Sequence, residues 1–226
     1  MGKLTVSARW LFVLFLLASL GCSHIAHRAN VNEGVNFSVL AAPSHETYDP
    51  PNRDYYNTYE PDTKFSGRGR TDFQISCGYA WKLRNTRKLM TQLNFAIAPE
   101  DGQYLPSAGI YYQASPDYSE SAAGFGALIG VDPVGYFIWG RDFAENSDGW
   151  NNAGVDIAVG MGSGPSYLAN AMLFYRHRHF QLGLFSEYRY FSKPFDLCDE
   201  NCDYSDYIKS RLSFGIIFIP GETEFY

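Results

Sequence analysis

The segment from Asp72 to Ala98 alternates apolar and polar side chains, and no other feature of the sequence limits the fold as strongly. Alternation with a period of two places successive side chains on opposite faces of a β-strand. The apolar positions are Phe73, Ile75, Cys77, Tyr79 and Trp81 in the first half and Leu89, Leu93, Phe95 and Ile97 in the second. A polar break at residues 83–88 separates the halves, so the segment predicts an antiparallel hairpin with one apolar face.

The opposite face of this hairpin carries small or uncharged polar side chains, among them Gly78, Ala80, Gln92 and Asn94. A face in contact with bulk water would carry Lys, Glu, Arg and Thr instead. Gly and Ala recur on the same face along the rest of the chain, where they would weaken strands exposed to water. Membrane barrels have this arrangement, with apolar side chains toward lipid and small polar ones inward.

Further alternating stretches continue to the end of the chain, and the full count is ten strands. Turns or loops join each strand to the next, which is the order of an up-and-down meander. We therefore predict an all-β fold, an antiparallel up-and-down meander closed into a β-barrel of about 8–10 strands. The barrel is expected over residues 34–219, with a first strand at 34–41, a long loop at 42–69 and a C-terminal tail at 220–226.

The chain begins with a pattern that is typical of a secretory signal peptide at residues 1–21. Lys3 and Arg9 precede an uncharged run at 10–20. That run is shorter than the roughly 20 residues that a helix needs to span a bilayer. Export from the cytoplasm is the expectation that follows.

Residues 19–22 read Ser-Leu-Gly-Cys and resemble the lipobox of bacterial lipoproteins, although Ser and Leu stand in the opposite order. The resemblance implies that Cys22 carries acyl chains such as palmitate, becomes the new N-terminus and leads into a lipidated tether at 22–33. Ser23, in place of Asp, is similar to the pattern that sorts lipoproteins to the outer membrane. An ordinary signal peptide cut after Gly21, with Cys22 incidental, remains the alternative.

The last strand resembles the C-terminal signal that the assembly machinery of the outer membrane recognises. Ser213, Gly215 and Phe218 match that signal, and Pro220 stands where a further aromatic residue is usual. The resemblance implies the barrel assembly machinery and outer-membrane lipid as partners, and the cell outer membrane as the location.

The charge of the chain argues against nucleic acid as a partner. Removal of residues 1–21 takes away Lys3 and Arg9, so the 18 basic residues fall to 16 against 24 acidic ones, and the formal net charge changes from −6 to −8. An acidic chain without a basic run does not bind nucleic acid well.

Charged residues on the small-residue face predict a polar network inside the barrel. Its expected members are Asp156, Glu187, Arg189, Lys209 and Arg211. Buried ion pairs serve mainly packing and registry, because desolvation offsets much of their attraction. An ion path or a binding site is the alternative for this network.

Two cysteines, Cys198 and Cys202, bracket an acidic loop at residues 192–206. An exported chain favours a disulfide between them. The acidic side chains of the loop are expected to be solvated, and a divalent-ion site is the weaker alternative.

No catalytic residue, metal site or cofactor is predicted. His177 and His179 share a face of a strand but lie beside Arg176 and Arg178, which favours a basic turn over a metal site. The glycine-rich residues 160–164 lack the Lys and the following helix of a phosphate loop, so they predict a hairpin turn. The His-x-Ser spacing of the lipid A deacylases is not found.

The sequence thus predicts an outer-membrane β-barrel lipoprotein with a structural, binding or narrow-pore role and an unknown ligand. One alternative is a lipid-anchored periplasmic barrel that resembles a lipocalin and is apolar inside. The other is an enzyme that modifies lipid. With ten strands and an anchor in the inner leaflet, the loops at 42–69 and 192–206 are expected outside the cell and the loop at 141–152 in the periplasm.

Overall fold

The computed structural model describes residues 24–48, 68–83, 87–99, 103–115, 121–130, 133–143, 152–162, 166–177, 180–190 and 208–220. The predicted signal peptide, Cys22, and the loop that carries Cys198 and Cys202 lie outside these ranges.

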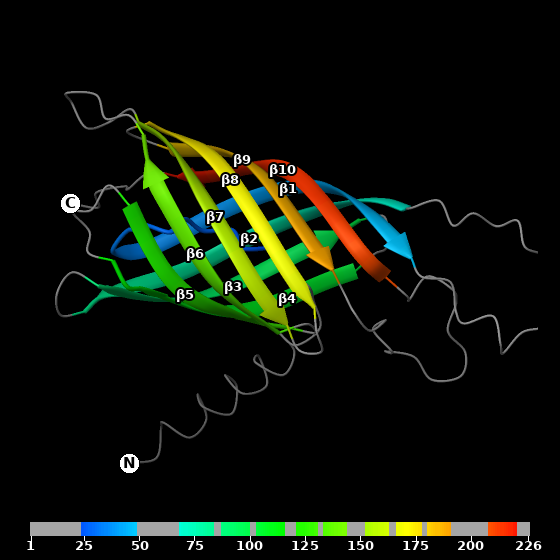
Figure 1. Cartoon of the computed structure of the whole chain (residues 1–226), viewed down its shortest axis with the longest axis horizontal. Coiled ribbons are helices and arrows are strands. Elements are labelled where there is room, and N and C mark those ends of the chain that lie inside the picture. Colours follow the sequence, from blue (N-terminus) through cyan, green and yellow to red (C-terminus); the bar gives the residue numbers. More distant parts are fainter. Residues whose placement is uncertain are drawn as a thin grey trace, which may run out of the picture.

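Ten strands form one closed barrel in which every strand pairs antiparallel with its neighbours in the chain and β1 pairs with β10 (Figure 1). The strands are β1 (Gly34–Tyr48), β2 (Arg68–Lys82), β3 (Lys88–Ala98), β4 (Gln103–Gln113), β5 (Ser121–Ile129), β6 (Val134–Asp142), β7 (Asn152–Gly162), β8 (Tyr167–His177), β9 (Phe180–Tyr190) and β10 (Ile208–Pro220). The all-β meander and its closure into a barrel are therefore confirmed.

β1 is longer than the sequence predicts. The loop is expected at 42–69 because these residues are dense in Pro, Asp, Asn and Tyr. Proline in particular usually marks the end or edge of a strand, since it cannot donate a hydrogen bond to the sheet. In the structure, however, residues 42–46 pair with residues 68–72 of β2. The pairing with β10 resumes at Ser44, so flanking strands on both sides hold this part of β1 in the sheet.

The apolar face of the strands points away from the barrel axis. Each of the ten strands exposes at least one large apolar side chain, for example Val35 at 72% and Leu184 at 62%. The apolar side chains predicted to share a face in the hairpin at 72–98, such as Phe73, Ile75 and Phe95, are exposed together. The direction of the faces predicted from the alternation is confirmed.

The interior is more apolar than the small-residue face suggests. An apolar cluster of Met90, Tyr111, Tyr136, Ile138 and others fills the side of the lumen formed mainly by β3–β7. Glycines make room for these large side chains: a Cβ on Gly126 would lie 2.2 Å from Cζ of Tyr136. The small residues predicted for a crowded interior are thus matched by large partners on adjacent strands.

Residues 24–33, called the lumenal segment below, run inside the barrel. Seven of them, residues 24–29 and 31, are buried, and Ala29 is fully inaccessible. The segment passes from the level of Gln74 on β2 to that of Gln113 at the last position of β4, and then turns through Gly34, with φ of 94°, into β1. A tether is the expectation from the sequence, whereas in the structure these residues contact the wall of the lumen.

Candidate functional site

The backbone of the lumenal segment is bound by side chains of the barrel wall. At His24, the amide of Gln74 makes two hydrogen bonds: Oε1 accepts from the His24 backbone N at 2.8 Å, and Nε2 donates to the His24 backbone O at 3.0 Å. A buried segment outside helices and strands needs such partners because each backbone N–H and C=O that loses water must be paired.

Similar contacts continue along the lumenal segment. They are Ser38 Oγ to Ala26 O at 2.7 Å, Tyr111 Oη to Ala29 O at 2.6 Å, Gln113 Oε1 from Val31 N at 3.1 Å, and Lys88 Nζ to Val31 O. These partners come from β1, β3 and β4, so the wall binds the segment from several sides. The wall of the lumen therefore binds the backbone of an irregular peptide segment that belongs to the same chain.

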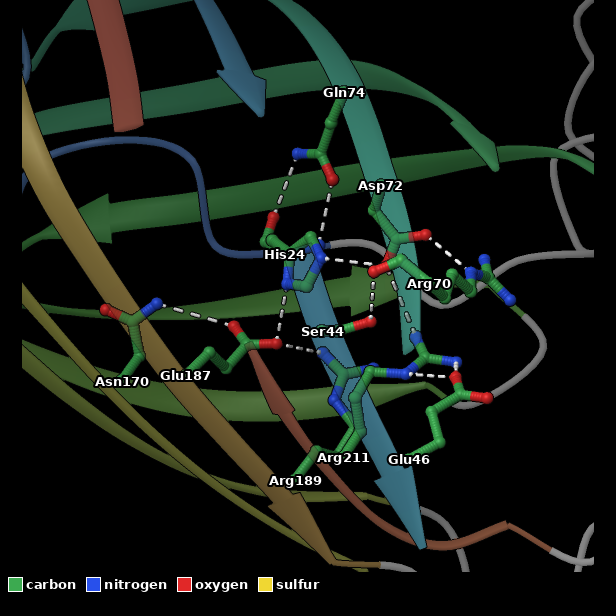
Figure 2. A network of polar contacts seen from close by, with 10 residues as sticks. All are labelled: His24, Ser44, Glu46, Arg70, Asp72, Gln74, Asn170, Glu187, Arg189 and Arg211. Atoms are coloured by element: carbon green, nitrogen blue, oxygen red, sulfur yellow. Dashed lines mark hydrogen bonds and ion pairs between the residues drawn. The ribbon is translucent and has the colours of Figure 1, made fainter. Parts of the chain in front are cut away.

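His24 bridges two carboxylates. Its Nδ1 lies 2.9 Å from Oε1 of Glu187, and its Nε2 lies 3.3 Å from Oδ2 of Asp72 (Figure 2). Carboxylates only accept hydrogen bonds, so both ring nitrogens donate and the ring is the imidazolium form. Burial opposes this charge, but Glu187 and Asp72 outweigh it and raise the pKa of His24 above its usual value.

Arginines surround the same carboxylates and complete the network in Figure 2. The contacts are Arg70 Nε to Asp72 Oδ1 at 2.6 Å, Arg211 Nε to Glu46 Oε1 at 2.7 Å, Arg189 Nη2 to Glu187 Oε1 at 3.3 Å, and Asn170 Nδ2 to Glu187 Oε2 at 3.4 Å. Because β1, β2, β8, β9 and β10 all contribute, the network ties His24 to half of the barrel wall.

The predicted interior residues fall into two places. Glu187, Arg189 and Arg211 lie together around His24, whereas Asp156 contacts Arg28. The backbone of Lys209 is part of β10, and its side chain lies outside the description. His24, Arg28 and Glu46 belong to these networks but are not predicted from the sequence.

Arg28 contacts a different group of side chains. Its Nη2 donates to Asp142 Oδ1 at 2.9 Å, its Nε to Asp156 Oδ2 at 3.3 Å, and its Nη1 to Gln181 Oε1 at 3.2 Å. The guanidinium carbon lies 3.2 Å from the centroid of the Phe174 ring. Every nitrogen of the guanidinium group therefore has an acceptor of its own, and one flat face is covered by an aromatic ring.

His27 is the uncharged counterpart of His24. Its Nδ1 lies 2.9 Å from the backbone O of Arg28, and its Nε2 lies 2.6 Å from the hydroxyl of Tyr136. A carbonyl can only accept, so Nδ1 donates and Nε2 accepts from Tyr136. Burial without a facing carboxylate lowers the pKa of His27 to about 4.

One small pocket lies beside the lumenal segment. A pocket of about 30 Å³ lies between the segment and β1–β3, lined by residues such as Ser38, Ser76 and Gln92. This volume holds about one water molecule. Within the described ranges, no cluster of His, Cys, Asp or Glu has the arrangement of a metal site.

Comparison with known proteins adds little. No family model matches the sequence, and no curated protein matches it. Among solved structures, an outer membrane channel from Pseudomonas putida F1 is 9% identical, with 88% of this chain and 99% of that chain covered and a TM-score of 0.42. At that score the likeness carries no functional inference. In the described part of the chain no helix is long and apolar enough to cross a membrane.

Proposed function

We propose that the protein is a β-barrel of the outer membrane whose lumen is closed by its own N-terminal segment, and that release of this segment opens a narrow pore. The observation that carries the proposal is the binding of residues 24–33 along the barrel axis by side chains of the wall. A purely structural barrel would not need polar wall side chains that bind a peptide backbone, because apolar side chains alone could fill its lumen.

The outer surface supports a membrane location. Among the side chains described on outward strand positions, Arg141 is the only Lys, Arg, Asp or Glu, and it stands second from the end of β6. Charged side chains are costly at the bilayer midplane and tolerated near its edges. This surface also argues against the lipocalin-like alternative, in which apolar side chains would face a ligand inside.

Ionic conductance in planar lipid bilayers tests the pore. The wild-type mature protein should give little current, and a variant with residues 24–32 replaced by a Gly-Ser sequence of equal length should give stepwise current. Heat-dependent mobility in gels serves as the control for folding. A folded variant that conducts no better than wild type would refute the pore, and a wild-type chain that is soluble and monomeric without detergent would refute the membrane location.

Acylation of Cys22 remains part of the proposal. The path of the lumenal segment restricts where the acyl anchor can lie. His24 is buried and stands two positions after Cys22, with one residue between them, so the two Cα atoms lie at most about 7 Å apart. The segment runs from His24 toward the start of β1, so the anchor is expected nearer the end of the barrel at which β1 ends. Cys22→Ala should abolish labelling by an alkyne fatty acid; persistent labelling would refute the lipobox.

That position changes the expected topology. An anchor in the inner leaflet would turn the end at which β1 ends toward the periplasm, the reverse of the orientation predicted from strand count. Epitope tags near Asn57, Ser147 and Glu200 distinguish the two orientations. With the segment in place and Cys22 acylated in the inner leaflet, only the tag near Ser147 should bind antibody on intact cells.

A further inference from the structure

We propose that the pocket around Arg28 is a guanidinium-binding site that accepts small guanidinium compounds as well as the arginine of its own chain. The site consists of Asp142 on β6, Asp156 on β7, Phe174 on β8 and Gln181 on β9. Access to this site in the native protein rests on the proposed release of the lumenal segment, but the chemistry of the site does not.

The geometry distinguishes a guanidinium group from other cations. Asp142, Asp156 and Gln181 each supply one oxygen to a different nitrogen of Arg28, at 2.9, 3.3 and 3.2 Å. Three acceptors around the edge and the Phe174 ring over the face match a planar group with donors in a fixed fork. A compact ammonium has no such plane and cannot reach all three acceptors at once.

The charge and burial of Asp156 are a second reason to expect that the pocket binds a cation. Asp156 is 1% exposed, and its Oδ1 has no hydrogen-bond partner in the described part of the chain. Without Arg28, the buried carboxylate of Asp156 would lose the cation that lies between it and Asp142, and two neighbouring carboxylates favour a bound cation. The side chain of Asp142 is 27% exposed, which leaves the site open on one side to a small molecule.

Chemical rescue of Arg28→Ala in the full mature chain tests the site. The thermal unfolding of this variant in detergent micelles is measured with methylguanidinium and, as a matched control, with methylammonium at the same concentration. Methylguanidinium at several times its Kd should raise the melting temperature by about 2–4 °C. Methylammonium should give no comparable rise, and the double variant Arg28→Ala, Asp156→Asn should lose the response.

If Arg28→Ala does not fold on its own, the measurement becomes the yield of folded barrel after refolding with and without methylguanidinium. Equal effects of the two cations would show charge compensation only and overturn the proposal, as would the absence of any rescue. Neither readout depends on conductance, so failure of the site and failure of the pore are distinguishable.

Discussion

Gly140 on β6 lies directly against Ala29 of the lumenal segment. A Cβ on Gly140 would lie 2.9 Å from Cβ of Ala29 and 1.8 Å from Oδ1 of Asp156. Asp156 cannot turn away freely, since its other oxygen accepts from the backbone N of Ala29 and from Nε of Arg28. The missing side chain at Gly140 therefore lets the segment and its carboxylate partner pack against the wall.

Gly140→Ala should loosen the lumenal segment. Overpacking of a filled interior costs about 1–3 kcal/mol, and here the cost falls on the contact between wall and segment. Hydrogen exchange of the backbone amides of residues 24–33 should become faster. Gly135→Ala on the same strand is the control, because its Cβ would meet nothing closer than 4.0 Å. Equal exchange in the two variants would contradict the assigned contact.

His24 should make the barrel less stable at alkaline pH. Its pKa in the folded protein is raised above the unfolded value of 6.5 by Glu187 and Asp72 against the effect of burial. The protonated ring therefore contributes stability that is complete below pH 6.5 and is lost as the pH rises through the folded pKa. Chemical denaturation across this range should show the loss, and His24→Gln should flatten it. An unchanged slope in the variant would exclude His24 as its source. Arg70, Arg189 and Arg211 also face these carboxylates.

His27 should have the opposite effect at acidic pH. Its folded pKa of about 4 lies below the unfolded value of 6.5. The neutral ring thus contributes stability above pH 6.5 that is lost as the pH falls toward 4. His27→Gln should reduce this acid-side loss in the same denaturation experiment, with His45→Gln as the control for an exposed histidine on β1. A loss of equal size in both variants would count against the assignment.

The hydroxyl of Tyr111 should hold the centre of the lumenal segment. Tyr111→Phe leaves the buried backbone O of Ala29 without the donor that lies 2.6 Å away. An unpaired buried acceptor costs about 1–3 kcal/mol. Proteolysis within residues 24–33 should become faster, whereas Tyr188→Phe, on the outward face of β9, should have no effect. The same sensitivity in both variants would indicate a general loss of stability.

The cost in stability of a charged side chain on the outer surface should depend on its depth in the bilayer. Leu184 is 62% exposed at the middle of the outward face of β9, and Arg at the bilayer midplane costs about 2–4 kcal/mol. Leu184→Arg should lower the stability of the barrel in lipid vesicles, while Phe143→Arg, just beyond the end of β6, should cost only about 0–1 kcal/mol. Unchanged stability of Leu184→Arg would mean that this face does not meet lipid.

The sequence alone determined the fold class and which side chains share a strand face, because a period of two is a local property. Alternation at residues such as Phe73, Ile75 and Leu93 indicates which side chains share a face, and parity alone puts Glu187, Arg189 and Arg211 on the face opposite the apolar side chains. Parity did not give the end of β1 or the start of β2, where Pro43 pairs with Thr71 of β2 and the pairing of β1 with β10 resumes at Ser44.

Only the tertiary structure decided what occupies the lumen. Residues 24–33 have no apolar period, and their partners are distant in the chain: Gln74 is 50 residues from His24, Tyr111 is 82 from Ala29, and Asp156 is 127 from Ala29. Those contacts exist only once ten strands have closed and their inward side chains converge on one axis. For the same reason the charge of His24 and the pocket around Arg28 have no signature in the sequence, since each depends on carboxylates that the closed barrel brings together.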